Sequence, residues 1–194
     1  EVSLVVAALQ QAYRLAYLDP LTDLPARRYF SRHLRSLRPP FAVAFVSIDR
    51  FWWIRDTYGD EVADQVVRAV ASMLVRDATD RAVYRLGGED FAVLLPGLDG
   101  MRARAVMEGL CSRVAAREFF LRSPARGKGP EEARKRGLGG EKHIVLSISA
   151  GLAAAETGPV DTTALAREAD RALTIAIGAG GHRVQGDAVS GAPA

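Results

Sequence analysis

The sequence lacks several features that would place it in a specialised class of protein. It has one cysteine, Cys111, in 194 residues, which excludes an intrachain disulfide and a metal cluster built from several cysteines. A single cysteine is also typical of a reducing cytoplasm. No apolar run approaches the length of a membrane span, and no signal-peptide pattern begins the sequence. We therefore expect no direct insertion into a membrane.

The net charge of +3 is concentrated in one segment. Residues 121–143 carry seven basic and three acidic side chains, so this segment sums to +4 and the rest of the chain to −1. Specific binding of nucleic acid needs basic residues interleaved with aromatic ones on a structured face. The segment contains no Phe, Tyr or Trp. We predict a solvated loop and no nucleic-acid partner.

With 48% apolar residues, the chain is able to bury one core. The apolar periodicity predicts helices at 2–17, 26–37, 50–58, 60–75, 102–117 and 162–177, and strands at 41–48, 143–155 and 182–185. A hairpin is predicted at 82–96. This order predicts an α/β fold, with a central mixed, largely antiparallel sheet of about five strands surrounded by helices.

The sequence suggests three parts. Residues 1–18 are interpreted as an N-terminal signalling or linker helix, whose apolar stripe fits a short coiled coil with a second copy. Residues 19–186 form the α/β domain, and 187–194 read as a tail or linker. Because the chain starts with Glu1, we expect it to be part of a longer protein.

The turn of the predicted hairpin reads Gly-Gly-Glu-Asp at 87–90. Gly87 and Gly88 allow a backbone to approach a ligand closely. Glu89 and Asp90 supply the hard oxygen ligands that Mg²⁺ prefers beside phosphates. Taken alone, the four residues also fit an ordinary hairpin turn.

Five blocks in order carry a resemblance to a known family. They are LDPLTDLPARRYF (18–30), VSIDRFWWIRDTYGDEVADQVVRAVA (46–71), RLGGEDFAVLLPG (85–97), LSISAGLA (146–153) and ADRALTIAIGAGGHRV (169–184). Together they resemble the GGDEF, or diguanylate cyclase, family over nearly the whole chain. The resemblance implies a bacterial, cytoplasmic signalling domain. In active members two GTP-loaded domains face each other, and with Mg²⁺ each 3′-hydroxyl attacks the other's α-phosphate to give cyclic di-GMP.

The resemblance also places the family's metal and catalytic positions on this chain. Ser47 stands where the family has a metal-binding aspartate, and Ile48 still offers its carbonyl. We expect the next residue, Asp49, to point to the opposite face. Glu89 is acceptable at its position in the hairpin. Asp90 replaces a glutamate, and its side chain is shorter by about 1.5 Å.

The base and phosphate positions are also altered. Trp52 replaces a phosphate-contacting lysine, and Arg55 replaces the asparagine that reads guanine, so the amide acceptor is lost. Asp64 retains the family's aspartate. In the last helix, Ile177 and Gly181 replace a lysine and an arginine that bind phosphate.

The motif with which the family binds its product is incomplete in this sequence. Family members often bind their product through an arginine-x-x-aspartate motif before the hairpin. Here Arg76 and Asp80 are separated by three residues, and Arg81 follows. Binding of cyclic di-GMP through Arg76, Asp80 and Arg81 stays an open interpretation.

Three functions remain open from the sequence. The first is a degenerate domain that acts as a regulatory or interaction module, with a homodimer partner or other domains of its own protein as partners. The alternative is an active cyclase in which Glu89 and Asp90 hold the metal. The second alternative is a sensor that binds GTP or cyclic di-GMP without turnover. Mg²⁺ is expected only if a nucleotide binds.

Trp52 and Trp53 are expected on the flank of their helix, as packing or protein-contact residues.

Overall fold

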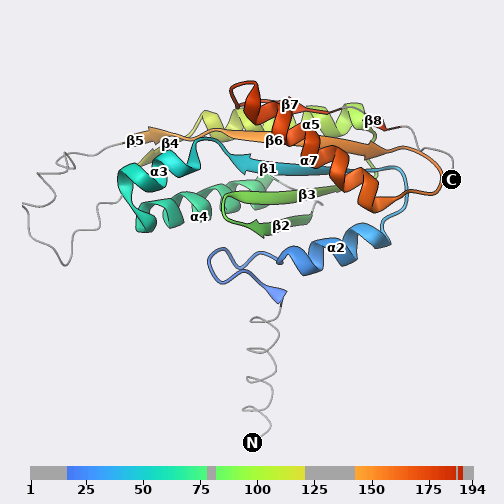
Figure 1. The fold of residues 1–194 in the computed structure, drawn as a ribbon, viewed down its shortest axis with the longest axis horizontal. Coiled ribbons are helices and arrows are strands. Elements are labelled where there is room, and N and C mark those ends of the chain that lie inside the picture. Colours follow the sequence, from blue (N-terminus) through green and yellow to red (C-terminus); the bar gives the residue numbers. More distant parts are fainter. Residues whose placement is uncertain (1–16, 78–81, 121–142, 187, 190–194) are drawn as a thin grey trace, which may run out of the picture.

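The computed structural model describes residues 17–77, 82–120, 143–186 and 188–189 (Figure 1). The helices are α2 (Arg27–Ser36), α3 (Phe51–Tyr58), α4 (Asp60–Asp77), α5 (Gly100–Ala115) and α7 (Thr162–Gly178). The strands are β1 (Phe41–Ile48), β2 (Ala82–Gly87), β3 (Asp90–Pro96), β4 (Glu118–Phe120), β5 (His143–Val145), β6 (Ile148–Ala155), β7 (Val184–Gln185) and β8 (Ala188–Val189). The helix predicted at 2–17 lies almost wholly outside the described residues.

The main sheet has six strands, in the order β2-β3-β1-β6-β7, with β8 also paired to β6. The β2-β3, β3-β1 and β1-β6 pairs are antiparallel, and β7 and β8 run parallel to β6. This confirms the predicted mixed, largely antiparallel sheet among helices, and the hairpin at 82–96. Because β1 is central, the functional positions at its end lie between β3 on one side and β6 on the other.

Alternation along β1 divides the core between the two faces of the sheet. Ala42, Ala44 and Val46 pack in one cluster with apolar residues of α3, α4 and α5. Phe41 and Val43 pack in a second cluster with residues of α2 and α7. The sheet is therefore covered on both faces, which explains why β1 reads as a continuous apolar run.

Side-chain caps fix where two helices begin. The carboxylate of Asp99 accepts from the backbone N–H of Arg102 at 2.8 Å, so α5 starts at Gly100. The carboxylate of Asp161 accepts from the N–H groups of Thr163 and Ala164 at 2.9 and 3.1 Å, and α7 starts at Thr162. Such caps satisfy amides that the first helical turn leaves unpaired.

The prediction of one continuous strand over 143–155 was wrong. The chain leaves the strand conformation at Leu146 and Ser147, which separates β5 from β6. β5 pairs with β4 in a separate two-stranded sheet, whereas β6 joins the main sheet. The sequence pattern does not reveal this change of partner strand, because Leu146, at the break between β5 and β6, is apolar and buried like a core strand residue. In addition, β8 extends the sheet into residues 188–189, within the predicted tail.

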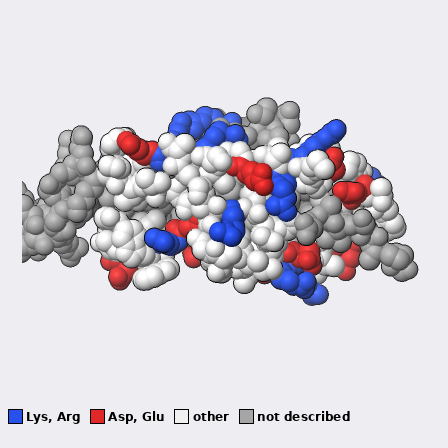
Figure 2. Space-filling model, turned by 90° about the horizontal axis from the view of Figure 1, so that it is seen from above, with Lys and Arg blue, Asp and Glu red and all other residues white. Residues whose placement is uncertain are grey.

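The surface of the described part shows mixed charge. On the face seen in Figure 2, basic and acidic side chains are interspersed among uncharged ones. Among the helices of the described ranges, none is both long enough and apolar enough to cross a membrane.

Cys111 lies in the core on α5 and is 4% exposed. Burial, together with the charges of Asp49 and Glu108, raises the pKa of its thiol to about 12. Since the thiolate is the reactive form, we expect the native protein at pH 8 to react with DTNB roughly a hundredfold or more slowly than the protein unfolded in urea. Rapid stoichiometric labelling of the native protein would contradict this placement.

Candidate functional site

The hairpin turn and the end of β1 meet in the structure. Ser47 pairs with Asp90 in the β1-β3 register, and its hydroxyl donates to Asp90 Oδ1 at 2.7 Å. The backbone N–H of Ile48 donates to the carbonyl oxygen of Glu89 at 3.3 Å. The four positions that the resemblance assigned to metal and catalysis are therefore brought together.

Gly87 and Gly88 form the turn through backbone conformations that other residues rarely adopt, with φ of +120° and +56°. A Cβ atom at either position would meet nothing within 4 Å. The glycines are thus required by the turn itself, and the space in front of the turn is open. That openness is compatible with the close approach of a ligand.

The expectation that Asp49 points away from Ser47 was wrong. The carboxylate of Asp49 accepts hydrogen bonds from the hydroxyls of Ser147 and Ser149 at 2.7 and 2.6 Å and from the N–H of His182 at 2.9 Å. Ser149 lies directly opposite Ser47 in the β1-β6 register, so both side chains share one face. Residues two apart on a strand face the same way, and Asp49 continues this alternation past the end of β1.

Arg85 is a central residue of the site that the sequence interpretation did not include. It is 5% exposed, and its guanidinium donates to the carbonyl oxygens of Gly88 and Asp90. The same group lies 4.7 Å from the ring centroid of Phe91 and 4.0 Å from the carboxylate of Asp19. The buried Arg85 side chain therefore stabilises the turn by donating to its carbonyl oxygens. Its place two residues before the glycine pair was the available clue.

Four acidic residues are near enough to affect the pKa of this arginine. Burial lowers the pKa of the Arg85 guanidinium, and the carboxylates of Asp19, Asp90, Glu89 and Asp64 oppose that shift. Asp64, on α4, therefore lies within the electrostatic reach of the hairpin. The segment before α2 also contacts Arg85, because the backbone N–H of Arg85 donates to the carbonyl oxygen of Pro25 at 2.9 Å.

Three of the nucleotide positions, Trp52, Arg55 and Asp64, lie on exposed surfaces of α3 and α4. Arg55 and Asp64 are exposed, and the Arg55 guanidinium lies 5.9 Å from the ring centroid of Phe51 on its own helix. Trp52 is 68% exposed. Phe51 and Ile54 are buried, which confirms that the two tryptophans lie on the flank of the helix.

The proposed product-binding residues are only partly described. Arg76 is exposed in the last turn of α4. Asp80 and Arg81 lie outside the described residues. Within the described ranges, no group of three or more His, Cys, Asp or Glu side chains is arranged to hold a metal ion.

Comparisons with known proteins agree on one family. The model of the diguanylate cyclase, GGDEF domain, matches residues 16–128. The response regulator PleD of Caulobacter vibrioides is 29% identical over 191 residues, which are 93% of this chain and 38% of PleD. The diguanylate cyclase DosC of Escherichia coli is 30% identical over 176 residues, which are 87% of this chain and 34% of DosC. The chain thus spans little more than a third of these relatives.

Solved structures give the same result. The coiled coil and GGDEF domain of DgcB from Caulobacter crescentus, in complex with c-di-GMP, superposes with a TM-score of 0.78 at 27% identity, covering 97% of this chain and 93% of that one. The GGDEF domain of FimX from Pseudomonas aeruginosa, at 18% identity and a TM-score of 0.73, shares the fold. The family model covers more than half of the chain, and the hairpin and β1 geometry agree with it: this chain belongs to the GGDEF, or diguanylate cyclase, domain family.

Proposed function

We propose that this domain is a catalytically degenerate GGDEF domain that serves as a regulatory or interaction module in a longer cyclic di-GMP signalling protein. The contact between Ser47 and Asp90 carries the proposal. A hydroxyl stands where the family has a metal-binding carboxylate, and it donates its proton to the neighbouring Asp90 carboxylate at 2.7 Å. The site therefore has one negative charge fewer than the family's pair of carboxylates. One oxygen of the remaining carboxylate, Asp90, already accepts a hydrogen bond from Ser47.

The residues present are a poor fit to the magnesium set of the family. Mg²⁺ is held in near-octahedral geometry by hard oxygen ligands, with carboxylates as the usual protein ligands. Here Glu89 and Asp90 are the remaining carboxylates of the set, beside the neutral Ser47 and the carbonyl of Ile48. These four residues therefore do not support metal-dependent phosphoryl transfer at this position.

The phosphate side of the site supports the same proposal. Trp52 and Ile177 supply no positive charge where the family has lysines. Gly181 has φ of +76°, and a Cβ there would lie 2.7 Å from Asp49 Oδ1. Because Asp49 is fixed by three donors, restoring an arginine at Gly181 would force this network to move. The family's phosphate-binding arginine is therefore absent, and a side chain at position 181 would collide with Asp49.

The alternative, an active cyclase, requires the hairpin acids to hold metal with help from Asp49 or Ser47. Asp49 faces the correct side of the sheet, but both of its carboxylate oxygens already accept hydrogen bonds. Individual contacts to developing charge contribute roughly 2.7–4 kcal/mol to catalysis. The loss of several such contacts argues against useful turnover.

We expect no cyclic di-GMP when the purified domain is incubated with GTP and either Mg²⁺ or Mn²⁺. The measurement is chromatography of the products, with an active family member assayed in parallel under the same conditions. We also expect the variant carrying both Ser47→Asp and Asp90→Glu to stay inactive, because Arg55, Trp52 and Ile177 still lack the base and phosphate contacts. Product formation by the unmodified domain at ordinary enzymatic rates would overturn the proposal.

The second alternative, binding without turnover, is supported by the open glycine turn, Glu89 and Asp64. A ligand that binds only the folded state raises the melting temperature by mass action. Thermal shift with GTP and with cyclic di-GMP separates this alternative from a pure interaction module.

We also propose that the partners are a second copy or further domains of the same protein, in the bacterial cytoplasm.

A further inference from the structure

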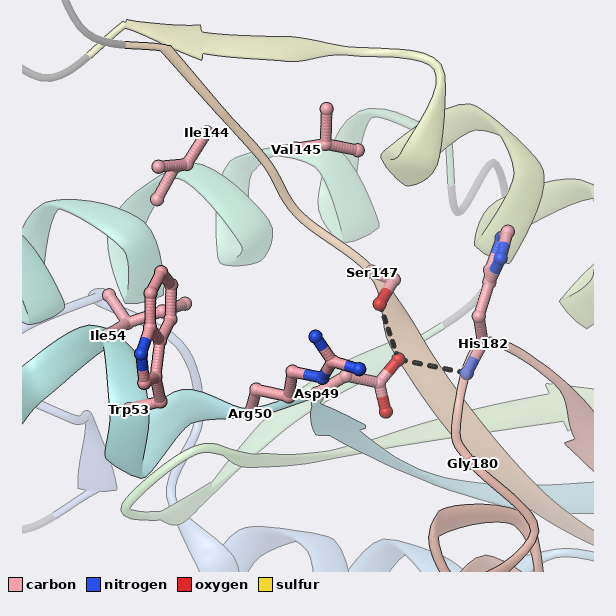
Figure 3. Close-up of a pocket in the computed structure, with 9 residues that line it drawn as sticks. All are labelled: Asp49, Arg50, Trp53, Ile54, Ile144, Val145, Ser147, Gly180 and His182. Carbon is pink, nitrogen blue, oxygen red and sulfur yellow. Dashed lines mark hydrogen bonds between the residues drawn. The ribbon is translucent and has the colours of Figure 1, made fainter.

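Basic side chains of this domain occur in two different settings. One set lies beside the nucleotide positions: Arg50 lines the pocket at the end of β1, where the carboxylate of Asp49 accepts from the hydroxyl of Ser147 (Figure 3). A second set of arginines lies on α2, at the edge of the fold away from α5 and β7 (Figure 1). The candidate nucleotide and metal positions do not include this second set.

The α2 segment carries positive charge alone. Arginine occupies positions 27, 28, 32, 35 and 38, and between Leu24 and Ile48 the sequence has no Asp, Glu or Lys. The chain outside residues 121–143 has a net charge of −1, so these five positive charges stand out against an otherwise acidic remainder. Like charges spaced four residues apart destabilise a helix. The stability of α2 therefore does not account for the pattern.

Helical spacing places three of these arginines in one row, which we call the α2 row. Arg28, Arg32 and Arg35 follow one another at i, i+4 and i+7, so they share one side of the helix. All three are exposed. Phe30 and Leu34, on the opposite side, are 5% and 4% exposed because they pack in the core. With a rise of about 1.5 Å per residue, the α2 row is about 10 Å long.

The guanidinium groups of the α2 row have no partner among the described residues. Neither the row nor Arg38, which follows the helix, makes a hydrogen bond or an ion pair there. By contrast, Arg171 on α7 pairs with Glu168 of its own helix at 3.1 Å. A guanidinium has five donors and binds phosphate through paired hydrogen bonds. The α2 row therefore presents phosphate-binding groups to solvent.

The surroundings of the α2 row favour a flat anionic surface as its partner. The row lies on the outer side of a helix, whereas peptides are usually bound in grooves or at sheet edges. The exposed aromatic ring of α2, Tyr29, is stacked on Tyr84 and packs edge-on against Tyr17, so it is not available to stack on a nucleic-acid base. Since Phe30 and Leu34 are buried in the core, α2 has no apolar face with which to enter hydrocarbon.

We propose that the α2 row, together with Arg38, binds the surface of a bilayer that contains anionic phospholipids. The guanidinium groups donate to phosphate oxygens of neighbouring headgroups, and α2 stays outside the hydrocarbon. Each arginine near such a surface strengthens binding roughly fivefold. Four of them give an association that is weak, reversible and sensitive to salt. The proposal does not depend on whether the GGDEF site is degenerate.

Flotation of the full chain with lipid vesicles tests the proposal. We expect binding to vesicles of equal parts phosphatidylglycerol and phosphatidylcholine, no binding to phosphatidylcholine alone, and release at about 1 M NaCl, where the Debye length is about 3 Å. Inorganic phosphate at the same phosphate concentration should not displace the protein, because single ions do not reproduce an array of headgroups. Binding that persists at high salt, equal binding to both vesicles, or displacement by phosphate overturns the proposal.

The α2 row itself is tested by the variant carrying Arg32→Gln and Arg35→Gln. Both side chains are exposed and without a partner among the described residues, so we expect an unchanged melting temperature and a roughly 25-fold loss of affinity for the anionic vesicles. The matched control carries Arg68→Gln and Arg102→Gln, which remove the same net charge from exposed positions of α4 and α5. It should bind within about twofold of the unmodified chain. Equal binding by the two variants would mean that net charge or the basic segment 121–143 attracts the vesicles, and would overturn the proposal.

A double-stranded DNA fragment, at the same salt and phosphate concentration, separates a lipid surface from nucleic acid. We expect DNA to bind more weakly than the anionic vesicles, because a row this short reaches fewer phosphates on a duplex than on a continuous layer of headgroups. Tighter binding to DNA than to vesicles, lost in the variant carrying Arg32→Gln and Arg35→Gln, would assign the α2 row to nucleic acid and overturn the proposal.

Discussion

We expect Arg85→Met to lower the free energy of unfolding by about 3 kcal/mol. The guanidinium of Arg85 is 5% exposed and donates to the carbonyl oxygens of Gly88 and Asp90. Its ion pair with Asp19 also ends, although Asp19 keeps the N–H and hydroxyl of Thr22 as donors. Methionine fills much of the volume but leaves two carbonyl oxygens of the turn without their donor.

Chemical denaturation is the measurement, and hydrogen exchange of the turn amides reports whether the hairpin opens locally. The control is Arg102→Met, which removes an arginine that is 75% exposed and pairs with Asp99 on the surface of α5. Surface pairs of this kind contribute about 1 kcal/mol or less. Equal stability losses in the two variants, or unchanged exchange of the β2-β3 amides in Arg85→Met, would show that Arg85 does not hold the turn.

The parts of the fold that were predictable have strong local patterns. The apolar run at 41–48, the hairpin around Gly87 and Gly88, and the amphipathic helices were all recognised from spacing and turn residues. The core stripe of Phe51 and Ile54 also placed the tryptophans correctly. In each case, neighbouring residues alone determine the pattern, so no knowledge of distant contacts is needed.

What the sequence did not reveal depends on contacts between distant segments. Asp49 owes its orientation to Ser147, Ser149 and His182, which are about a hundred residues or more further along the chain. β4 is only three residues long and is defined by its pairing with β5. The role of Arg85 arises from Asp19 and the hairpin together. Periodicity carries no information about such partners.

Gly151→Ala is expected to be severely destabilising for a different reason, namely close packing of a helix on the sheet. Gly151 lies on β6, and a Cβ there would approach the carbonyl oxygen of Ala169 and the nitrogen of Leu173 to 2.1 Å. Both atoms belong to the backbone of α7, so a side-chain rotation does not relieve the overlap. We expect a loss of about 3 kcal/mol, and a fall in melting temperature of roughly 6–12 °C.

Gly178→Ala is the matched control, because Gly178 is the last residue of α7 and a Cβ there would meet nothing within 4 Å. Its melting temperature should equal that of the unmodified protein or exceed it slightly, since alanine is the better helix former. A Gly151→Ala variant that melts within 2 °C of the control would mean that α7 moves away from β6 at little cost, contrary to about 3 kcal/mol of overpacking. Because α7 leads into Gly181 and His182, which lie against Asp49, such a displacement would also move the hydrogen-bond network of Asp49 at the end of β1. Packing at Gly151 therefore determines both the stability of the domain and the position of that network.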